Sequence, residues 1–257
     1  MFEIAADVFV QVRRGSSRVP DKALLTLADR TCLDHVLVRA RDAREARHVV
    51  VCTSDAPEDA VLAESAAAAG ARFFQGALDN VIDRFLRCAD ELGTQVIVRV
   101  AGDSPLVDPG CIDGAIRRLL DEDLDYVHTK SLPVGTYVEA FRTDALRRAE
   151  RAAVDASRSE DLTFYVGREE INRVGEYLPP EPLRRGDLVL ALNRPEDVPV
   201  LRAVLEHAGR DGDYVTLGRA IAWLDEHPDV AASNRDYVPV PTRGNTELDP
   251  SRLGAGA

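Results

Sequence analysis

The segment VFVQVRRGSSRVPDK, residues 8–22, joins a short apolar run to a loop that holds four basic side chains and one acidic side chain. The β-branched residues of 8–12 predict a buried strand, and the glycine, serine and proline of 13–22 predict a loop directly after it. Ligands of open α/β sheets collect at the carboxyl ends of the strands. This cationic loop is therefore the first candidate for a binding site.

The rest of the first half of the chain repeats this order of strand and helix. Further strands are predicted over 48–52, 72–75 and 96–100. The helices between them are predicted over 32–42, from Pro57 to Gly70, and from about 80 to Gly93. Such alternation is typical of a layered α/β fold with a mostly parallel sheet.

The second half is less regular. We expect strands near Tyr126, over 136–141 and, as a last core strand, over 188–192, with helices over 109–121, 143–153, 158–170, after Pro195 and over 216–226. A single domain is predicted over 1–238, in which 133–186 forms a smaller subdomain. Proline, glycine and polar residues dominate 239–257, which predicts a mobile tail.

Composition limits the partners of this 257-residue chain. Its 32 Lys and Arg against 44 Asp and Glu give a net charge of −12, which opposes binding to nucleic acid and to anionic membranes. No apolar run approaches the roughly 20 residues that span a bilayer, and the N-terminus shows no basic start, so we expect a cytoplasmic protein. The four cysteines form no C-x-x-C pair and are expected to be buried thiols.

The loop over 13–22 has the composition of a polyphosphate cradle. Gly15 lets the backbone approach a ligand closely, the hydroxyl of Ser16 can donate to phosphate oxygens, and the basic side chains supply charge. Neither the P-loop nor the dinucleotide-binding glycine spacing is present. The alternative is a solvated turn whose arginines pair with neighbouring acids.

A second polar loop follows the apolar strand over 96–100. It reads Ala-Gly-Asp-Ser-Pro over 101–105, so Asp103 is a candidate ligand at the same sheet edge. The alternative is a turn that the aspartate stabilises. Asp108, directly before Pro109, is expected to cap a helix.

Taken together, these motifs resemble those of a known enzyme family. The patterns are Arg-x-Gly-Ser-x-Arg-x-Pro-x-Lys over 13–22 and Arg-Val-x-Gly-Asp-x-Pro-Leu-x-Asp-Pro over 99–109. Smaller matches occur at 53–55, 74–84, 138–141 and 195–197. Their order resembles the cytidylyltransferases that make CMP-3-deoxy-manno-octulosonate and their relatives in spore-coat polysaccharide synthesis, over about residues 8–205.

The resemblance implies a three-layer, Rossmann-like nucleotidyltransferase fold, similar to glycosyltransferase A, with a mixed sheet and a small dimerisation subdomain over 133–186. It implies transfer of CMP from CTP to a small acid, with Mg²⁺ as cofactor, in a homodimer. The residues that match the family's phosphate-binding and catalytic positions are Arg13, Ser16, Arg18 and Lys22, with Gly15 in the same loop. Asp103 matches its metal ligand, and the candidates for reading the base are Thr53, Asp55, Arg84 and Arg99. Arg84 could instead pair with Asp83.

Three positions depart from the family pattern, and all fall in the acceptor half. Tyr137 stands where an aspartate is expected two residues before Glu139, Asp161 where a histidine is expected after Glu160, and Asn193 where the second metal aspartate is expected. We nevertheless assign Tyr137, Glu139 and Asp161 to acceptor binding and Asn193 to the metal, through its carbonyl oxygen.

The change to Asn193 suggests an acceptor. A sugar acid attacks with a hydroxyl that must lose a proton, for which a second carboxylate is useful. A phosphonate such as phosphonoformate attacks with an oxygen that is already anionic and that a second carboxylate would repel. We therefore favour a phosphonate over an octulosonate- or neuraminate-type sugar acid. The alternatives are a sugar-1-phosphate nucleotidyltransferase or related glycosyltransferase, and a degenerate nucleotide-binding paralogue.

Overall fold

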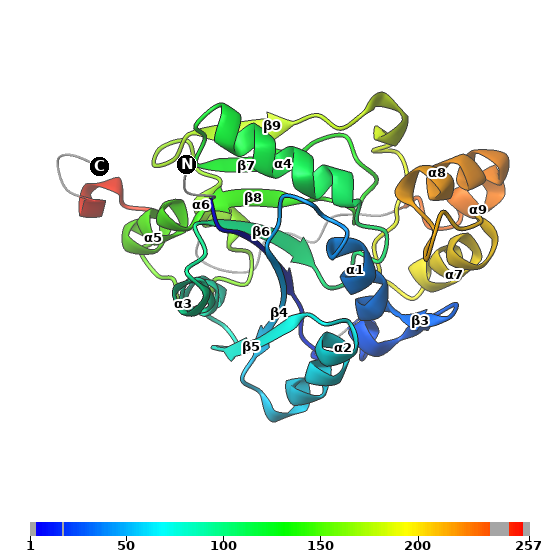
Figure 1. The fold of residues 1–257 in the computed structure, drawn as a ribbon, viewed down its shortest axis with the longest axis horizontal. Coiled ribbons are helices and arrows are strands. Elements are labelled where there is room, and N and C mark those ends of the chain that lie inside the picture. The colour runs from blue at the N-terminus through cyan, green and yellow to red at the C-terminus, as the bar shows by residue number, and fades with distance from the viewer. Residues whose placement is uncertain (1–3, 17, 237–246, 254–257) are drawn as a thin grey trace.

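Figure 1 shows the computed structural model, which describes residues 4–16, 18–236 and 247–253. Its main element is a seven-stranded sheet in the order β5-β4-β1-β6-β8-β7-β9. The strands are β1 (Ala6–Gln11), β4 (His48–Ser54), β5 (Arg72–Gly76), β6 (Val96–Ala101), β7 (Tyr126–Thr129), β8 (Glu139–Arg142) and β9 (Val174–Tyr177). Only β8 runs antiparallel to its neighbours. A two-stranded hairpin, β2 (Thr26–Leu27) with β3 (Arg30–Thr31), lies apart from the sheet.

Helices cover both faces of the sheet (Figure 1). One face packs against α1 (Cys32–Ala40), α2 (Leu62–Ala68) and α4 (Pro109–Asp121), and the other against α3 (Val81–Leu92), α5 (Thr143–Ala152) and α6 (Thr163–Val166). Successive residues of a strand point to opposite faces. In β1, Val8 and Val10 enter the first core and Phe9 the second. The predicted three-layer α/β architecture is confirmed.

A third group of helices lies at one end of the molecule, on the right of Figure 1. It contains α7 (Asp197–His207), α8 (Leu217–Glu226) and α9 (Pro228–Ala232), whose apolar faces join the core of the first layer. Short 3₁₀ turns complete the fold: η1 (Lys22–Leu24), η2 (Pro57–Val61), η3 (Glu181–Leu183) and η4 (Pro250–Leu253).

The register of the central strands places both polar loops side by side. Gln11 lies opposite Ala101, so β1 and β6 end together and their loops leave the sheet at the same edge. The backbones approach closely there, because the Gly102 amide donates to the Gln11 carbonyl at 2.9 Å. A Cβ atom on Gly102 would lie 2.5 Å from the Cβ of Val12. Glycine is therefore required where the second loop begins.

Two predicted elements are wrong. Residues 158–170 contain only the four-residue α6, because Ser159 bonds to the start of α3 and Gly167 ends the short helix. Residues 188–192 are buried but add no strand to the sheet, since Val189 forms a single bridge with Val134. An apolar run of five residues looks the same in either setting.

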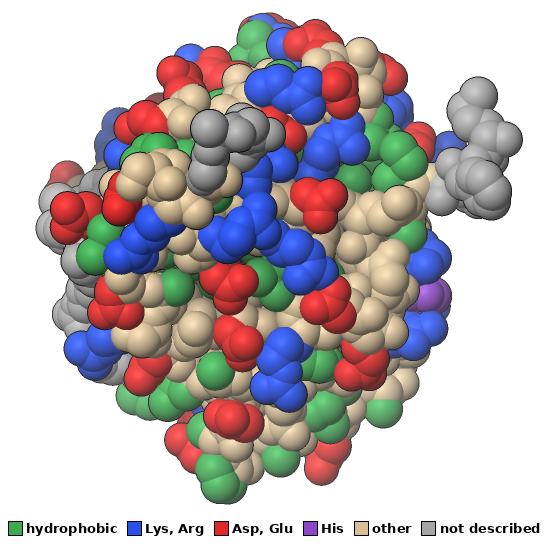
Figure 2. Space-filling model, turned by 90° about the vertical axis from the view of Figure 1, so that its left-hand side faces the viewer, with side chains coloured by type: hydrophobic (Ala, Val, Ile, Leu, Met, Phe, Trp, Pro, Cys, Tyr) green, Lys and Arg blue, Asp and Glu red, His purple; other side chains and the backbone are tan. Residues whose placement is uncertain are grey.

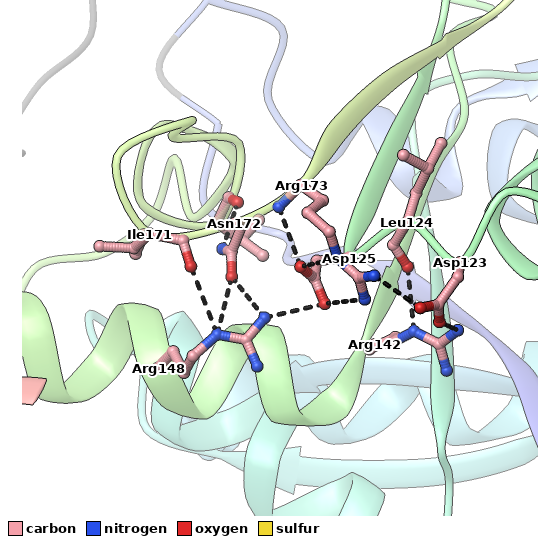
Figure 3. Close-up of polar contacts among 9 residues, drawn as sticks. Asp123, Leu124, Asp125, Arg142, Arg148, Ile171, Asn172 and Arg173 are labelled. Atoms are coloured by element: carbon pink, nitrogen blue, oxygen red, sulfur yellow. Dashed lines mark hydrogen bonds and ion pairs between the residues drawn. The ribbon is translucent and has the colours of Figure 1, made fainter. Parts of the chain in front are cut away.

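The segment 133–186 contributes β8 and β9 to the main sheet. Three arginines and two aspartates hold its second half in place, as Figure 3 shows: Arg142, Arg148, Arg173, Asp123 and Asp125. In this network, Arg148 on α5 donates to Asp125 at 2.9 Å and to Asn172 at 2.8 Å. It therefore anchors the link that leads into β9, an edge strand that the sequence analysis missed. Contact of 133–186 with a second copy stays a prediction.

The predicted tail over 239–257 lies mostly outside the described residues. Its described part, 247–253, is held against the end of α5. The Asp249 amide donates to the Ala152 carbonyl at 2.7 Å, and the Val154 amide donates to the Glu247 carbonyl at 3.0 Å. The mobility predicted for 239–257 stays a prediction.

The surface beside α5 carries basic and acidic side chains in close alternation (Figure 2).

All four cysteines are buried, as predicted. Among the described helices, none combines the length and the apolar character needed to cross a membrane.

Candidate active site

A cavity of about 370 Å³ opens where β1 and β6 end, between loop 13–22, α3 and the segment 160–161. Ten of the predicted site residues line it: Arg13, Gly15, Ser16, Arg18, Lys22, Arg84, Arg99, Asp103, Asp161 and Asn193. Glu160 lines it too, so that five cationic side chains face three acidic ones, a net of +2 in a chain of net charge −12. The walls of this cavity thus favour a polyanion.

Lys22 joins three segments that are far apart in the sequence. From η1, its ammonium donates to Asp103 Oδ2 and, at 3.3 Å, to Asn193 Oδ1. The side chains of Lys22 and Asp103 are only 18% and 21% exposed, so solvent screens this pair less than a surface ion pair. The structure thus brings the compact cation of the first loop to the candidate metal ligands.

The backbone around Asn193 is held by a residue that we had assigned no role. Asp197 is fully buried and accepts the amide hydrogens of Asn193 at 2.9 Å and Arg194 at 2.8 Å. Asn234 donates to the same carboxylate at 3.0 Å. Asp197 is the last residue of the Pro-Glu-Asp motif over 195–197, so the motif match pointed to this residue. Its carboxylate orients the backbone of Asn193 and Arg194.

The arginines of the loop divide between two tasks. Arg13 donates to Glu160 Oε1 at 2.7 Å, and Gln11 donates to the Glu160 carbonyl at 3.0 Å. Arg18 is exposed at the rim of the cavity and makes no ion pair within the described part of the chain. Arg14, by contrast, pairs with Asp21 and does not line the cavity. The Glu160 carboxylate therefore occupies a place at Arg13 that a phosphate oxygen could take.

This arrangement predicts that Glu160 competes for Arg13 with CTP, the ligand that the family resemblance implies. Glu160→Gln should tighten CTP binding about two- to fivefold, because a partly exposed ion pair contributes only about 0.2–1 kcal/mol. Calorimetric titration with CTP measures the change. Glu170→Gln, which breaks the exposed pair with Arg168 outside the cavity, is the matched control and should leave the CTP affinity unchanged. Weaker CTP binding by Glu160→Gln would mean that Glu160 supports the site.

Two of the candidate base-reading residues lie outside the cavity. Thr53 is fully buried and donates to Asp59 Oδ2 at 3.0 Å, and Asp55 is exposed beyond the end of β4, with its amide bonded to the Gly76 carbonyl. Neither lines the cavity. The Thr53 hydroxyl is thus bonded to Asp59, and the assignment of both residues to nucleotide binding stays a prediction that the cavity lining does not support.

Arg84 lies in the cavity wall but is largely used within the protein. Its guanidinium donates to the carbonyls of Ala77 at 2.7 Å and Leu78 at 2.9 Å, and not to Asp83. Only 2% of the residue is exposed, and burial lowers the pKa of the side chain. Arg84 therefore shapes the turn between β5 and α3.

Arg99 and Glu139 form a buried pair beneath the cavity. Arg99 donates to Glu139 Oε2 and to Gln11 Oε1, both at 2.5 Å, while Tyr126 and Thr163 donate to the Glu139 carboxylate at 2.6 and 2.9 Å. Burial alone would raise the pKa of Glu139, but the Arg99 guanidinium and the two hydroxyls lower it overall. Glu139 is thus an ionised group that fixes Arg99.

The three residues assigned to acceptor binding lie in different places, and their role stays a prediction. Glu139 does not line the cavity, since its oxygens are taken by protein donors, and Tyr137 does not line it either. Asp161 does line the cavity. Asp108 caps α4 as predicted, by accepting the Cys111 amide hydrogen at 2.9 Å.

Comparison with known proteins agrees with this geometry. Residues 8–194 match the sequence pattern of the family described as Cytidylyltransferase. An uncharacterized protein of Methanocaldococcus jannaschii is 31% identical over 88% of this chain and 92% of its own length. The spore coat polysaccharide biosynthesis protein SpsF of Bacillus subtilis is 30% identical over 86% of this chain and 95% of its own.

The fold is also found in a solved structure. A cytidylyltransferase from Leptospira borgpetersenii aligns with a TM-score of 0.81, covering 93% of this chain and 100% of that one at 21% identity. This likeness concerns the fold, whereas the sequence match covers both polar loops and extends to Asn193. The chain belongs to the cytidylyltransferase family, the CTP-dependent nucleotidyltransferases that transfer CMP to an acceptor.

Proposed function

We propose that the cavity binds CTP and that the enzyme transfers CMP to a small anionic acceptor with release of pyrophosphate. The observation that carries this proposal is the position of Lys22 against Asp103 and Asn193, beside a loop from which Arg13 and Arg18 face the same space. A triphosphate carries about four negative charges, so an anionic nucleophile can approach only where fixed cations offset them.

In the proposed reaction an acceptor oxygen attacks the α-phosphorus in line with the leaving group. The new P–O bond forms as the bond to the β-phosphate oxygen breaks, and pyrophosphate leaves with the electron pair, so the configuration at phosphorus inverts. Lys22 offsets charge on the α-phosphate and the leaving oxygen, because an ammonium is a compact point charge. Arg13 and Arg18 hold β- and γ-phosphate oxygens, for which a guanidinium offers paired donors.

Mg²⁺ is part of this proposal. The Asp103 and Asn193 oxygens both face one cation, the Lys22 ammonium, and hard oxygen donors of this kind suit Mg²⁺. Within the described residues no cluster of three His, Cys, Asp or Glu side chains could hold a metal alone. Asp103 and Asn193 would therefore hold the ion together with phosphate and water oxygens. When bound, it supplies charge neutralisation and orients the phosphates.

For the acceptor we propose a phosphonate. Asn193 contributes an uncharged oxygen 3.3 Å from Lys22, where an aspartate would add a negative charge close to an attacking anion. A sugar acid is the second candidate. It is supported by the similarity to the Bacillus subtilis spore coat polysaccharide biosynthesis protein over 95% of that protein's length.

The test is a substrate panel. Each of the four nucleoside triphosphates is combined with phosphonates, such as phosphonoformate, and with octulosonate- and neuraminate-type sugar acids, while pyrophosphate is measured. Our proposal requires CTP-dependent release with a phosphonate. Turnover with sugar acids alone would contradict the proposed phosphonate acceptor but would support the proposed CMP transfer. Binding of CTP without release by any acid would indicate a nucleotide-binding paralogue.

The residue at 193 allows a sharper prediction. Asn193→Asp places a carboxylate beside Lys22 and should lower turnover of a phosphonate at least about tenfold through repulsion of the anionic nucleophile. The same variant should retain or gain turnover of a sugar acid, whose hydroxyl needs a proton acceptor. The ratio of the two rates within one protein preparation serves as its own control. An unchanged ratio would remove the argument for a phosphonate.

A homodimer through 133–186 also remains a proposal. Four large apolar side chains of this segment are exposed, namely Tyr137, Val154, Phe164 and Leu178, with 43%, 39%, 48% and 49% of their surface accessible.

A further inference from the structure

On the side of loop 13–22 away from the cavity lies a set of contacts that no part of the proposed chemistry uses. Asp59, in η2 after β4, is only 1% exposed. Its Oδ1 accepts the Arg14 amide hydrogen at 2.8 Å, and its Oδ2 accepts the hydroxyls of Thr53 and Ser54. A buried carboxylate is stable only when its oxygens are bonded in this way. Asp59 therefore ties the first turn of the loop to the end of β4.

The Arg14 side chain extends this connection to the other end of the loop. Its Nε donates to Asp21 Oδ1 at 2.8 Å, and its Nη1 donates to the Glu58 carbonyl at 3.3 Å. Asp21 has a φ of 52°, a left-handed conformation that costs a non-glycine residue energy and that needs support from its surroundings. The exposed ion pair adds little stability. Its effect is geometric, because it closes the loop on itself.

We call Asp59, Arg14 and Asp21 the clasp. The residues next to Arg14 and Asp21 in the chain face the cavity. Arg13 and Gly15, on either side of Arg14, line the cavity, and so does Lys22, which follows Asp21. The clasp residues do not line it. The separation of Arg13 from Lys22 is thus set from outside the cavity, by residues that do not line it.

We propose that Asp59 and Arg14 are positioning residues that hold the cations of the loop at the spacing of a triphosphate. This inference rests on the proposed CTP site and adds how that site is pre-organised. Donors held in place before binding cost less entropy to order when the ligand arrives. Loss of the clasp should therefore weaken binding of the β- and γ-phosphates and have little effect on the rest of the nucleotide.

The test compares the affinities for CTP and for CMP, which lacks those two phosphates, by calorimetry with Mg²⁺ present. In Asp59→Asn and Arg14→Gln the dissociation constant for CTP should rise about tenfold, while that for CMP changes less than twofold. The double variant should be little worse than either single one, since both changes release the same loop. A purely structural role would affect CTP and CMP alike.

Matched controls exist elsewhere in the chain. Asp113, 5% exposed, likewise accepts two backbone amides, those of Arg44 and Glu45, and Arg117 pairs with Glu45 on the surface. Asp113→Asn and Arg117→Gln should leave both affinities unchanged. If Asp59→Asn does not fold, Arg14→Gln still decides, because its side chain lies at the surface. Equal losses of affinity for CTP and CMP, or an unchanged CTP affinity, would contradict the positioning role of Asp59 and Arg14. A wild-type protein that binds no CTP would contradict the proposed function instead.

Discussion

Lys22→Ala should lower the rate of CMP transfer by about 10² or more, with a smaller effect on CTP affinity. Within the described residues, the Lys22 ammonium is the one cation that contacts both Asp103 and Asn193, and the proposed reaction places charge on the leaving oxygen beside it. Alanine removes that charge without adding bulk. Pyrophosphate release at saturating CTP and acceptor measures the change.

The chain provides a matched control, because it has only one other lysine. Lys130 is 55% exposed and pairs with Glu176 on the surface, outside the cavity. Lys130→Ala should retain the wild-type rate. If both variants keep the wild-type rate, Lys22 has no part in the chemistry. Lys22→Arg keeps the charge but not its compact shape, and we expect only partial recovery.

Asp103→Asn should have an effect of similar size, about 10² in the rate. The substitution keeps the shape of the side chain but removes the charge that pairs with Lys22 and that we propose binds Mg²⁺. We therefore expect a higher Mg²⁺ concentration at half-maximal rate in addition to the lower maximum. Titration of the rate with Mg²⁺ at fixed CTP separates the two effects.

The control for this change is Asp187→Asn, which removes a carboxylate that pairs with Arg185 on the surface. It should alter neither the rate nor the Mg²⁺ dependence. If Asp103→Asn keeps the Mg²⁺ dependence of the wild type, Asp103 does not bind the metal and serves only as the ion-pair partner of Lys22. The metal would then have to be held by other groups.

Most of the central fold could be predicted from the sequence, and the failures have a common cause. The strands β1, β4 and β6 are mainly apolar runs between clear turn residues, and β5 carries two adjacent phenylalanines, so short-range patterns suffice. Residues 188–192 are equally apolar, yet their backbone meets a single bridge partner, Val134. β9 contains a glycine and a glutamate and is an edge strand, for which the apolar signal is weak.

The candidate site shows the same division. Local sequence determined which loops carry the cations and the aspartate, and the parallel register of β1 with β6 made their meeting at one edge predictable. It did not indicate that Thr53 turns inward to Asp59, nor that Glu139 is saturated by Tyr126, Thr163 and Arg99. Those partners come from other elements, so their choice depends on how the layers pack.

The amino-acid sequence by itself thus determined most of the order of strands and helices, the family and the loops whose cations we propose bind a triphosphate, because covalent order and local patterning set which side chains follow which strand. Tertiary structure alone decided that Glu160 reaches Arg13 across 147 positions and that Asn193 reaches Lys22 across 171. A side chain binds substrate only if the fold has not already given its polar atoms a partner, and that competition is settled in three dimensions.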